Sequence, residues 1–218
     1  MTQANDSILV TPGTGATVAT HLAATKEYQV VMVADESGHI QQTLPTYNWW
    51  VPGAAVGASK LYADIFNAAG SGKILELRGL WAIPKSDVAI TGAVAVEVGL
   101  YRTSAVGTGG TAHTYNGGTA STAHVITPWD TTNSVPPAQV TARAVPTGGA
   151  TISALYWAQY VFTEETNAGT YMAAYTNLLP VATMTQRMTF NEGQGMLIKQ
   201  GTVAGVGSLA FLGLFTLV

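Results

Sequence analysis

The ten residues 93–102, AVAVEVGLYR, carry the clearest structural signal in the sequence. Every second residue from Val94 to Leu100 is apolar, whereas Glu97 and Tyr101 fall in the alternate positions. A period of two is that of a β-strand, in which successive side chains point to opposite faces of the sheet. We therefore predict a half-buried strand at these ten residues.

Runs of the same kind lie on both sides of this strand, and clusters of Gly, Pro, Thr and Asn separate them. Such runs, punctuated by turn residues, predict strands rather than helices. The expected elements are a hairpin of Tyr28–Asp35 with residues 40–44 around a turn at 36–39, and strands at Ser59–Asn67 and Lys73–Ile83 around a small-residue loop at 68–72 that favours a tight reversal. A helix over Leu61–Ala69 is the alternative to the strand Ser59–Asn67.

Two further runs are apolar on both faces. The run Ile152–Phe162 has aromatic side chains on one face and mainly aliphatic ones on the other. The run Ser208–Val218, which reads as the second arm of a hairpin with Gly195–Gln200, is apolar on both faces as well. We expect such strands to be inner strands of a sandwich whose outer surface meets another subunit. The candidate subunit-interface residues are Leu212, Leu214, Val218, Tyr156, Tyr160 and Phe162.

The segment between Thr103 and Thr151 is rich in Gly, Pro and Thr, which break any long element. It predicts an excursion of short strands and loops within one domain, with an interdomain linker as the alternative. Residues 1–20 lack periodicity and predict an N-terminal arm, with terminal disorder as the alternative. We therefore expect an all-β protein with an arm at residues 1–20 and a single antiparallel β-sandwich with long loops at residues 21–218.

The composition limits the partners of the chain. Only 10% of its 218 residues are charged, against about 25% in an average soluble domain. Nine basic and twelve acidic residues give a net charge of −3, so we expect no binding to nucleic acid or to an anionic membrane. With 47% hydrophobic residues and 24 Gly, the surface must consist largely of small neutral side chains, which suits permanent assembly. A stable monomer with a Thr-rich surface is the alternative.

Targeting and redox signals are absent from the sequence. There is no Cys, which excludes thiolate nucleophiles, Fe–S clusters and Cys-type zinc sites. The first residues lack the basic and apolar segments of a secretory signal. The most apolar run, Ser208–Val218, is shorter than the roughly 20 residues that cross a bilayer. We expect neither a secretory signal nor a membrane span.

The segment GSGK at residues 70–73 resembles the end of a phosphate-binding loop only superficially. Asn67 stands where the motif needs its first Gly and Ile74 where it needs Ser or Thr, so we predict a turn. The four histidines are scattered without metal-ligand spacing, and only His113 and His124 could face each other across a hairpin as a metal-binding or pH-responsive pair. We expect no catalytic residues, no metal and no cofactor.

Tyr47, Trp49 and Trp50 form an aromatic cluster before Pro52. An exposed Trp ring can stack on a sugar ring, so Trp49 and Trp50 are candidates for glycan stacking. In an extended chain the two rings point to opposite faces, so at most one of them can serve such a platform. Packing in the core or against another subunit is the alternative.

Four stretches, taken in order, resemble the tailed-bacteriophage virion proteins that dress heads, necks and tails. They are FNAAGSGK at 66–73, LYRTS at 100–104 leading into GTGGT at 107–111, PPAQVTAR at 136–143, and FNEGQGM at 190–196. The resemblance spans Tyr28 to Val218, and the NEGQG segment is similar to the turn before the closing hairpin of that family. The loop from Thr111 to Pro136 departs from the family pattern, because it is longer and richer in Thr, which leaves its contacts open.

This resemblance implies a jelly-roll-like sandwich with a structural role in the virion. The implied protein decorates or cements the capsid as a homo-oligomer such as a trimer. It is assembled in the host cytoplasm and contacts the major capsid protein or other virion proteins. A tail, neck or fibre component that acts as an adaptor or as a receptor- or glycan-binding module is the alternative. No catalytic residues come with the resemblance.

Overall fold

The computed structural model describes residues 17–23, 26–32, 44–85, 95–115, 125–130, 133–162, 175–179 and 187–218. Within these ranges the chain forms strands, turns and bends but no helix, which confirms the predicted all-β class. None of the described residues belongs to a helix that could span a membrane. The chain divides into two units, Met1–Leu44 and Pro45–Val218.

The first unit contains a β-hairpin. Its strands β1 (Thr17–Ala23) and β2 (Lys26–Met32) are antiparallel, with Ala23 opposite Lys26 and Thr17 opposite Met32. The predicted strand at 28–35 therefore overlaps β2, but the partner of β2 is β1.

Several sequence predictions fall outside the described residues. Residues 33–43 include the predicted turn at 36–39 and nearly all of the second arm of the predicted hairpin. Residues 1–16 make up most of the predicted N-terminal arm, and the rest of that arm belongs to β1.

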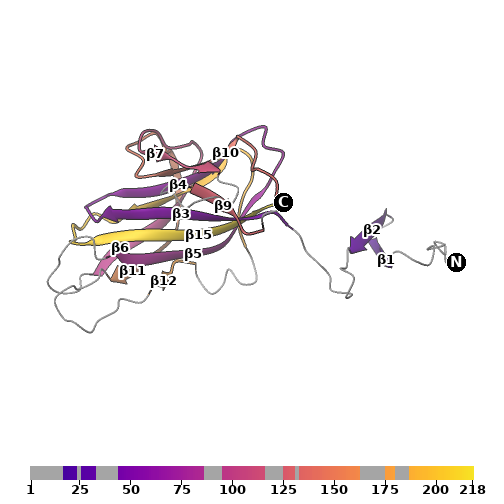
Figure 1. Cartoon of the computed structure of the whole chain (residues 1–218), viewed down its shortest axis with the longest axis horizontal. Coiled ribbons are helices and arrows are strands. Elements are labelled where there is room, and N and C mark those ends of the chain that lie inside the picture. Colours follow the sequence, from indigo (N-terminus) through magenta and orange to yellow (C-terminus); the bar gives the residue numbers. More distant parts are fainter. Residues whose placement is uncertain are drawn as a thin grey trace, which may run out of the picture. The chain divides into compact units, whose positions relative to one another are not determined.

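The second unit is a sandwich of two sheets (Figure 1). Its strands are β3 (Thr46–Ala55), β4 (Leu61–Asn67), β5 (Leu75–Lys85), β6 (Ala95–Thr103), β7 (Thr111–Ala112), β8 (Thr114–Tyr115), β9 (Val125–Pro128), β10 (Val140–Ala144), β11 (Ile152–Phe162), β12 (Thr176–Asn177), β13 (Met188–Phe190), β14 (Gln194–Gln200) and β15 (Ser208–Leu217). The six-stranded sheet has the order β11-β6-β14-β4-β10-β7. The seven-stranded sheet has the order β12-β5-β15-β3-β9-β8, and β13 also pairs with β5. All described pairs are antiparallel except β8 with β9.

Strands that follow one another in the chain lie mostly in opposite sheets. The chain changes sheet at every step from β3 to β6, and again between β14 and β15. The turns at 68–72 and 201–207 therefore do not close hairpins, contrary to the sequence prediction, but carry the chain from one sheet to the other. The long strands find their neighbours in distant parts of the chain, because β15 lies between β3 and β5 and β14 lies between β4 and β6.

The strand predictions that fall on the described residues of the sandwich are confirmed. Strand β4 covers the run for which a helix was the alternative. In β6, Val96, Val98 and Leu100 are buried while Glu97 and Tyr101 are only half-buried, so this strand has the two faces that its alternation predicts.

The core lies between the two sheets. Tyr62 of β4 packs on Phe211 of β15, with ring centroids 5.1 Å apart, and the Tyr62 hydroxyl donates to Oε1 of Gln200 at 2.5 Å. Burial raises the pKa of Tyr62, so the phenol stays protonated as a donor. Trp49 is fully buried against Gly213, where a Cβ would lie 2.8 Å from the indole ring. Position 213 therefore has no room for a side chain.

The excursion between residues 103 and 151 extends both sheets on one side. Strand β10 pairs with β4 and β7 in the six-stranded sheet, and β9 pairs with β3 and β8 in the seven-stranded sheet. The described part of this segment thus adds short strands to the sandwich, as its composition predicts.

Candidate functional site

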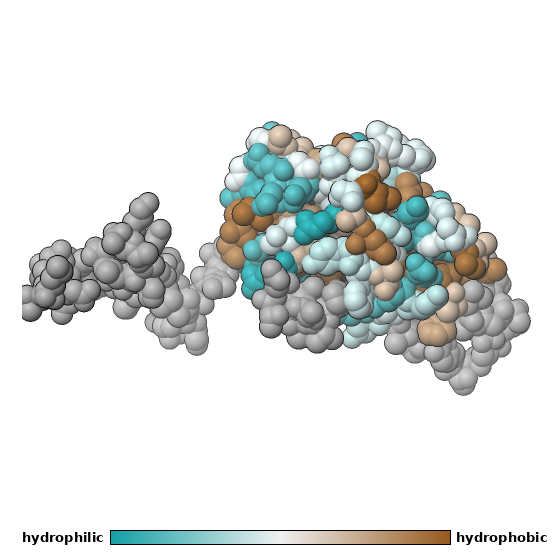
Figure 2. Space-filling view, turned by 180° about the vertical axis from the view of Figure 1, so that it is seen from behind, coloured by the Kyte–Doolittle hydropathy of each residue, from teal (hydrophilic) through white to brown (hydrophobic). Residues whose placement is uncertain are grey.

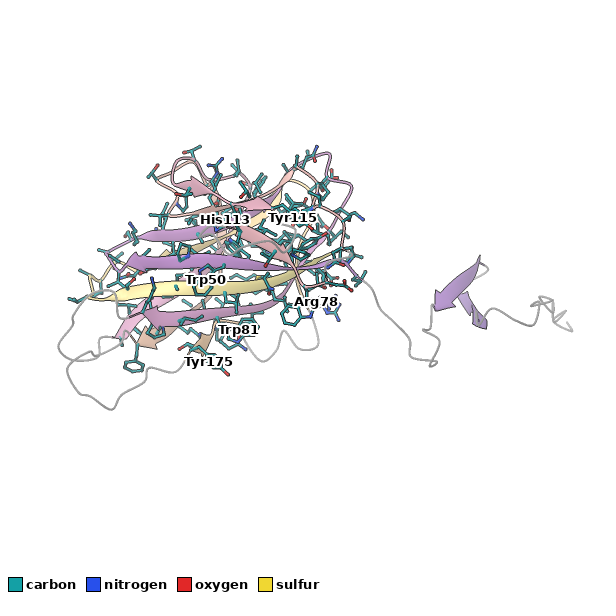
Figure 3. The ribbon with its side chains drawn as sticks, viewed as in Figure 1. Trp50, Arg78, Trp81, His113, Tyr115 and Tyr175 are labelled. Atoms are coloured by element: carbon teal, nitrogen blue, oxygen red, sulfur yellow. The ribbon has the colours of Figure 1, made fainter. Side chains whose placement is uncertain are left out.

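The outer face of the seven-stranded sheet carries a row of apolar side chains. Leu212 of β15 lies opposite Trp50 of β3 on one side and opposite Trp81 of β5 on the other. Directly opposed residues point to the same face, so three large side chains cross the middle of the sheet in a row. Figure 3 labels the two outer members of this row, Trp50 and Trp81. All three are half-buried. We define the outer patch as Trp50, Trp81, Ile83, Tyr175, Leu212 and Leu214.

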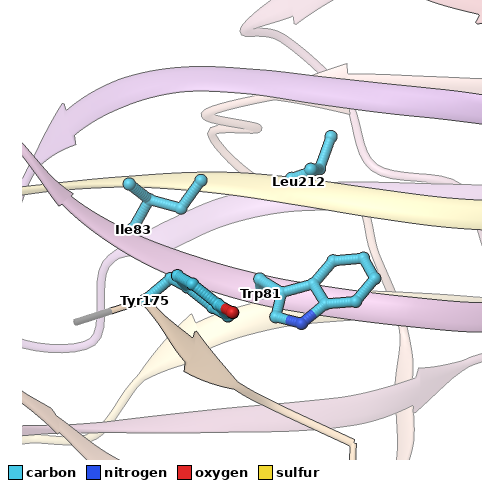
Figure 4. A pocket seen from close by; sticks show the side chains of 4 residues that line it. All are labelled: Trp81, Ile83, Tyr175 and Leu212. Atoms are coloured by element: carbon cyan, nitrogen blue, oxygen red, sulfur yellow. The ribbon is translucent and has the colours of Figure 1, made fainter.

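Part of the outer patch is hollow. Trp81, Ile83, Tyr175 and Leu212 line a cavity of ≈ 420 Å³ (Figure 4). A Cβ at Gly79 would lie 2.2 Å from the indole of Trp81, so the missing side chain lets this ring lie against the sheet. Tyr175, just before β12, is 70% exposed. The described lining offers ring faces and aliphatic groups, and none of its residues is charged.

Charged side chains border the patch toward the end of β15. Glu76 forms ion pairs of 3.0 Å with Arg78 and with Arg187. Nε of Arg78 donates to Oγ1 of Thr216 at 2.8 Å. Arg78 lies away from Trp50 and Trp81, toward the C-terminus (Figure 3). These charges are already paired with one another, so they delimit the apolar surface.

Strand β11 forms a second apolar surface. It is the edge strand of the six-stranded sheet and pairs with β6 alone among the described strands, so the prediction of an inner strand is wrong. Its large side chains are 38–66% exposed, apart from the buried Val161: Ile152, Leu155, Tyr156, Trp157, Tyr160 and Phe162. The alternation predicts the strand correctly, but the side chains that were expected to be covered on both faces meet solvent.

Two contacts fix β11 to the sandwich besides its pairing with β6. The guanidinium of Arg102 lies 5.3 Å from the ring centroid of Tyr156 and 5.2 Å from that of Phe190. The side-chain amide of Gln159 donates to the carbonyl of Asn177 at 2.6 Å, which joins the edge strands of the two sheets.

The structure distributes the candidate interface residues over both surfaces. Leu212 and Leu214 belong to the outer patch. Val218 is 44% exposed and exchanges backbone hydrogen bonds of 3.0 Å with Ile74 at the end of the sheet. The remaining three candidates, Tyr156, Tyr160 and Phe162, are exposed on β11.

The two candidates for glycan stacking differ in exposure. Trp49 faces the core and is 0% exposed, so its ring is not available to a ligand. Trp50 is half-buried on the outer face, as expected for residues that alternate in a strand. Sequence reasoning missed Trp81, Ile83 and Tyr175. The alternation in β5 signals the first two, because Trp81 lies between the buried Leu80 and Ala82 and Ile83 follows Ala82.

A buried carboxylate lies on the other sheet. Oδ2 of Asp64 accepts the amide of Gly107 at 2.6 Å. Desolvation raises the pKa of Asp64, while the Gly107 amide and the Arg143 charge oppose this rise. Seen from this side, the described surface is mostly hydrophilic or neutral, with hydrophobic residues in small separate groups (Figure 2). Asp64 holds the loop at 104–110 onto the sheet.

The GSGK segment has the predicted turn role. Gly70 and Gly72 adopt φ of 84° and 64°, and their amides donate to the carboxylate of Glu192 at 3.1 and 2.6 Å. These backbone hydrogen bonds lower the pKa of Glu192. A ring of amides of this kind binds anions in phosphate loops. Here it holds a carboxylate of the same chain.

Metal-binding groups do not gather in the described ranges. No set of three or more His, Asp or Glu residues there could hold a metal ion. Nε2 of His113 lies 3.0 Å from the carbonyl of Trp50, and His124 lies outside the described residues.

The chain matches no known protein family, no curated protein and no solved structure.

Proposed function

We propose that this protein is a structural subunit of a tailed-phage virion and that it decorates or cements the capsid as a homo-oligomer such as a trimer. Its partners are further copies of itself and the major capsid protein or another virion protein. The mechanism is mechanical: apolar faces bury area between copies and against the shell, and many repeated contacts stabilise the particle by mass action.

The strand order supports a jelly roll, the finer fold that we propose for the sandwich. Without the short added strands, the sheets read β3-β15-β5-β12 and β4-β14-β6-β11. The chain visits these eight strands in sequence order and changes sheet at every step except from β6 to β11. Jelly rolls of eight strands occur in viral capsids and in lectins, so this order is compatible with a virion role.

The outer patch is the observation that carries the proposal. Trp50, Leu212 and Trp81 form a row across the middle of the outward sheet face. On a sheet face that meets solvent, polar side chains would normally occupy these positions. Contiguous apolar surface of this kind marks interaction sites. Only 10% of the residues of this chain are charged. A partner surface that also carries little charge is therefore a suitable match for the outer patch.

Replacing Leu214 by Asp tests this role. We expect a folded, strand-rich protein that becomes monomeric or fails to enter particles, because an unpaired carboxylate is costly to bury at an interface. Sedimentation and circular dichroism on the same sample measure both properties. Val203→Asp is the matched control, since Val203 is 76% exposed in the loop between β14 and β15.

Two results would speak against the assembly role of the patch. A folded Leu214→Asp protein of unchanged oligomeric state would show that the patch needs no cover. An unfolded one would show that Leu214 serves the fold of its own chain. Copy number in purified particles separates capsid decoration from a place in the tail or neck.

Glycan binding is a second candidate function, and the cavity beside Trp81 favours it. Trp81 and Tyr175 offer two aromatic rings at one hollow, and stacking on such rings is a common way to hold a sugar. A glycan array with the intact protein and with Trp81→Ala tests this function. Binding that Trp81→Ala abolishes would support it, and an empty array would rule it out.

A further inference from the structure

The edges of the two sheets differ sharply in length. Three of them end in two-residue strands: β7, β8 and β12. The fourth edge is β11, with eleven residues. Very short edge strands are one of the devices by which proteins avoid pairing with other chains. Of the four outermost strands of the sandwich, β11 alone lacks this protection.

Apart from register shifts near its start, strand β11 lacks the charged residues and the Pro that also protect edge strands. Its sequence, ISALYWAQYVF, contains no charged residue, no Pro and no Gly. Register shifts occur only near its start, between Ile152 and Ala154 and between Leu155 and Trp157. From Trp157 to Phe162 the strand pairs with β6 without interruption. This segment is regular enough to accept a further strand.

Among the described residues, the backbone of β11 has hydrogen-bonding partners on one side only. Its backbone pairs with β6 alone, and no described residue pairs with its other side. The exposed rings of Tyr160 and Phe162, at 66% and 53%, stand on this uncharged strand. A new neighbouring strand would satisfy the backbone groups and cover part of these rings.

We infer that β11 pairs edge to edge with β11 of a second copy of this chain, in antiparallel orientation about a two-fold axis. When a strand pairs with the same strand of a second copy, its charged residues lie close to like charges of that copy. Strand β11 has no charged residue, so no such repulsion opposes the pairing. A two-fold axis perpendicular to the sheet makes the two strands antiparallel and joins two six-stranded sheets into one. This inference deepens the proposed assembly role and rests on it.

Charge placed on the edge tests the pairing. We expect Tyr160→Lys to raise the dissociation constant of the β11 contact at least tenfold in sedimentation velocity, because a lysine on an edge strand opposes pairing with another strand. Trp129→Lys is the matched control, since Trp129 is an aromatic residue of similar exposure, 69%, far from β11 in the sheet order. Circular dichroism verifies that both variants are folded.

Single cysteines locate the axis, because the chain has no Cys of its own. In an antiparallel pair, a step of two residues away from the axis separates the two copies of a position by about 13 Å more along the strands. Oxidative cross-linking of full-length variants must therefore peak at one position or at two adjacent ones. The variants carry Cys at Tyr156, Trp157, Ala158, Tyr160 or Phe162, one at a time.

The outcomes separate this inference from the assembly role. Loss of association in Tyr160→Lys alone, together with a peaked cross-linking profile, supports edge pairing. A flat or empty profile, or equal effects of both Lys variants, overturns it. If the protein stays oligomeric with a flat profile, the outer patch carries the assembly and only edge pairing fails. If the protein is monomeric at every concentration, both ideas fail.

Discussion

At the residue scale, Glu192 binds the loop at 68–72 although it lies far from this loop in the sequence. It lies 120 residues after Gly72, and the amides of Gly70 and Gly72 donate to its carboxylate. The lowered pKa of Glu192 means that folding favours the ionised form. Its contribution to stability is therefore complete above the pKa of the unfolded chain, ~4.3, and disappears as the pH falls through the lower pKa of the folded protein.

We expect Glu192→Gln to lower the melting temperature at pH 7 and to have little effect at pH 3. Gln keeps the shape but not the charge that the two amides bind. Melting curves at a series of pH values measure the difference. Glu97→Gln, a half-buried position on β6, is the control. A deficit that is equal at both pH values would contradict the anion-binding role of the loop.

The pH dependence of stability that Asp64 contributes has the opposite sign to that of Glu192. Burial raises the pKa of Asp64, so the folded protein loses stability as the pH rises from the unfolded pKa, ~3.9, through the folded one. We expect Asp64→Ala to cost about 1–3 kcal/mol, because the buried amide of Gly107 loses its acceptor. Asp64→Asn retains an acceptor, so it should cost less and remove this pH dependence.

Urea unfolding of the unchanged protein and of the two variants at a series of pH values from 3 to 8 measures both effects. Equal losses in Asp64→Ala and Asp64→Asn would show that the hydrogen bond to Gly107 does not hold the loop.

The sequence predicts the turn at 70–73 because Asn67 and Ile74 depart from the phosphate-loop motif. It does not predict that Glu192 fills this turn, since nothing local links positions so far apart. The exposed Tyr175 escaped prediction for the same reason, because only the folded sheet brings it beside Trp81.

At the element scale, β15 is the centre of its sheet and tolerates little change on its inner face. Gly213 lies directly against the indole of the fully buried Trp49. We expect Gly213→Ala to cost about 1–3 kcal/mol, because overpacking forces neighbouring side chains out of place. Gly148→Ala is the control, since the nearest atom to a Cβ there is 4.0 Å away. A neutral Gly213→Ala in chemical denaturation would show that Trp49 can move.

The alternation of side chains predicts strands and their faces, but it does not predict their partners. The period of two identifies the buried face of β6 and both faces of β15. The same pattern suits a hairpin arm and a strand that crosses to the other sheet, so the two predicted reversals were misassigned. The sequence predicts Leu212 and Leu214 as interface candidates because this central strand is apolar on both faces, and the alternation assigns both residues to one of them. No comparable pattern in the sequence indicates that β11 is an edge strand.

At the scale of the whole molecule, all core residues of the sandwich lie after Pro45. We expect a protein of residues 44–218 to fold with a melting temperature close to that of the full chain, because the hairpin β1–β2 belongs to the other unit. Differential scanning calorimetry measures this. A large loss of stability in the shortened protein would show that residues 1–43 support the sandwich.

The alternation of the chain between sheets also sets the order of events during synthesis on the ribosome. Strands β3 and β5 lack their common neighbour β15 until the end of the chain has emerged, and β4 and β6 wait in the same way for β14. Pairing between such distant segments is entropically slow and gives folding times of milliseconds to seconds. Until β14 and β15 have emerged, these strands can pair only along their other edges, β3 with β9, β4 with β10, β5 with β12 and β13, and β6 with β11. One edge of each strand therefore stays open until late in translation, and such open edges expose the nascent chain to aggregation before the sandwich is complete.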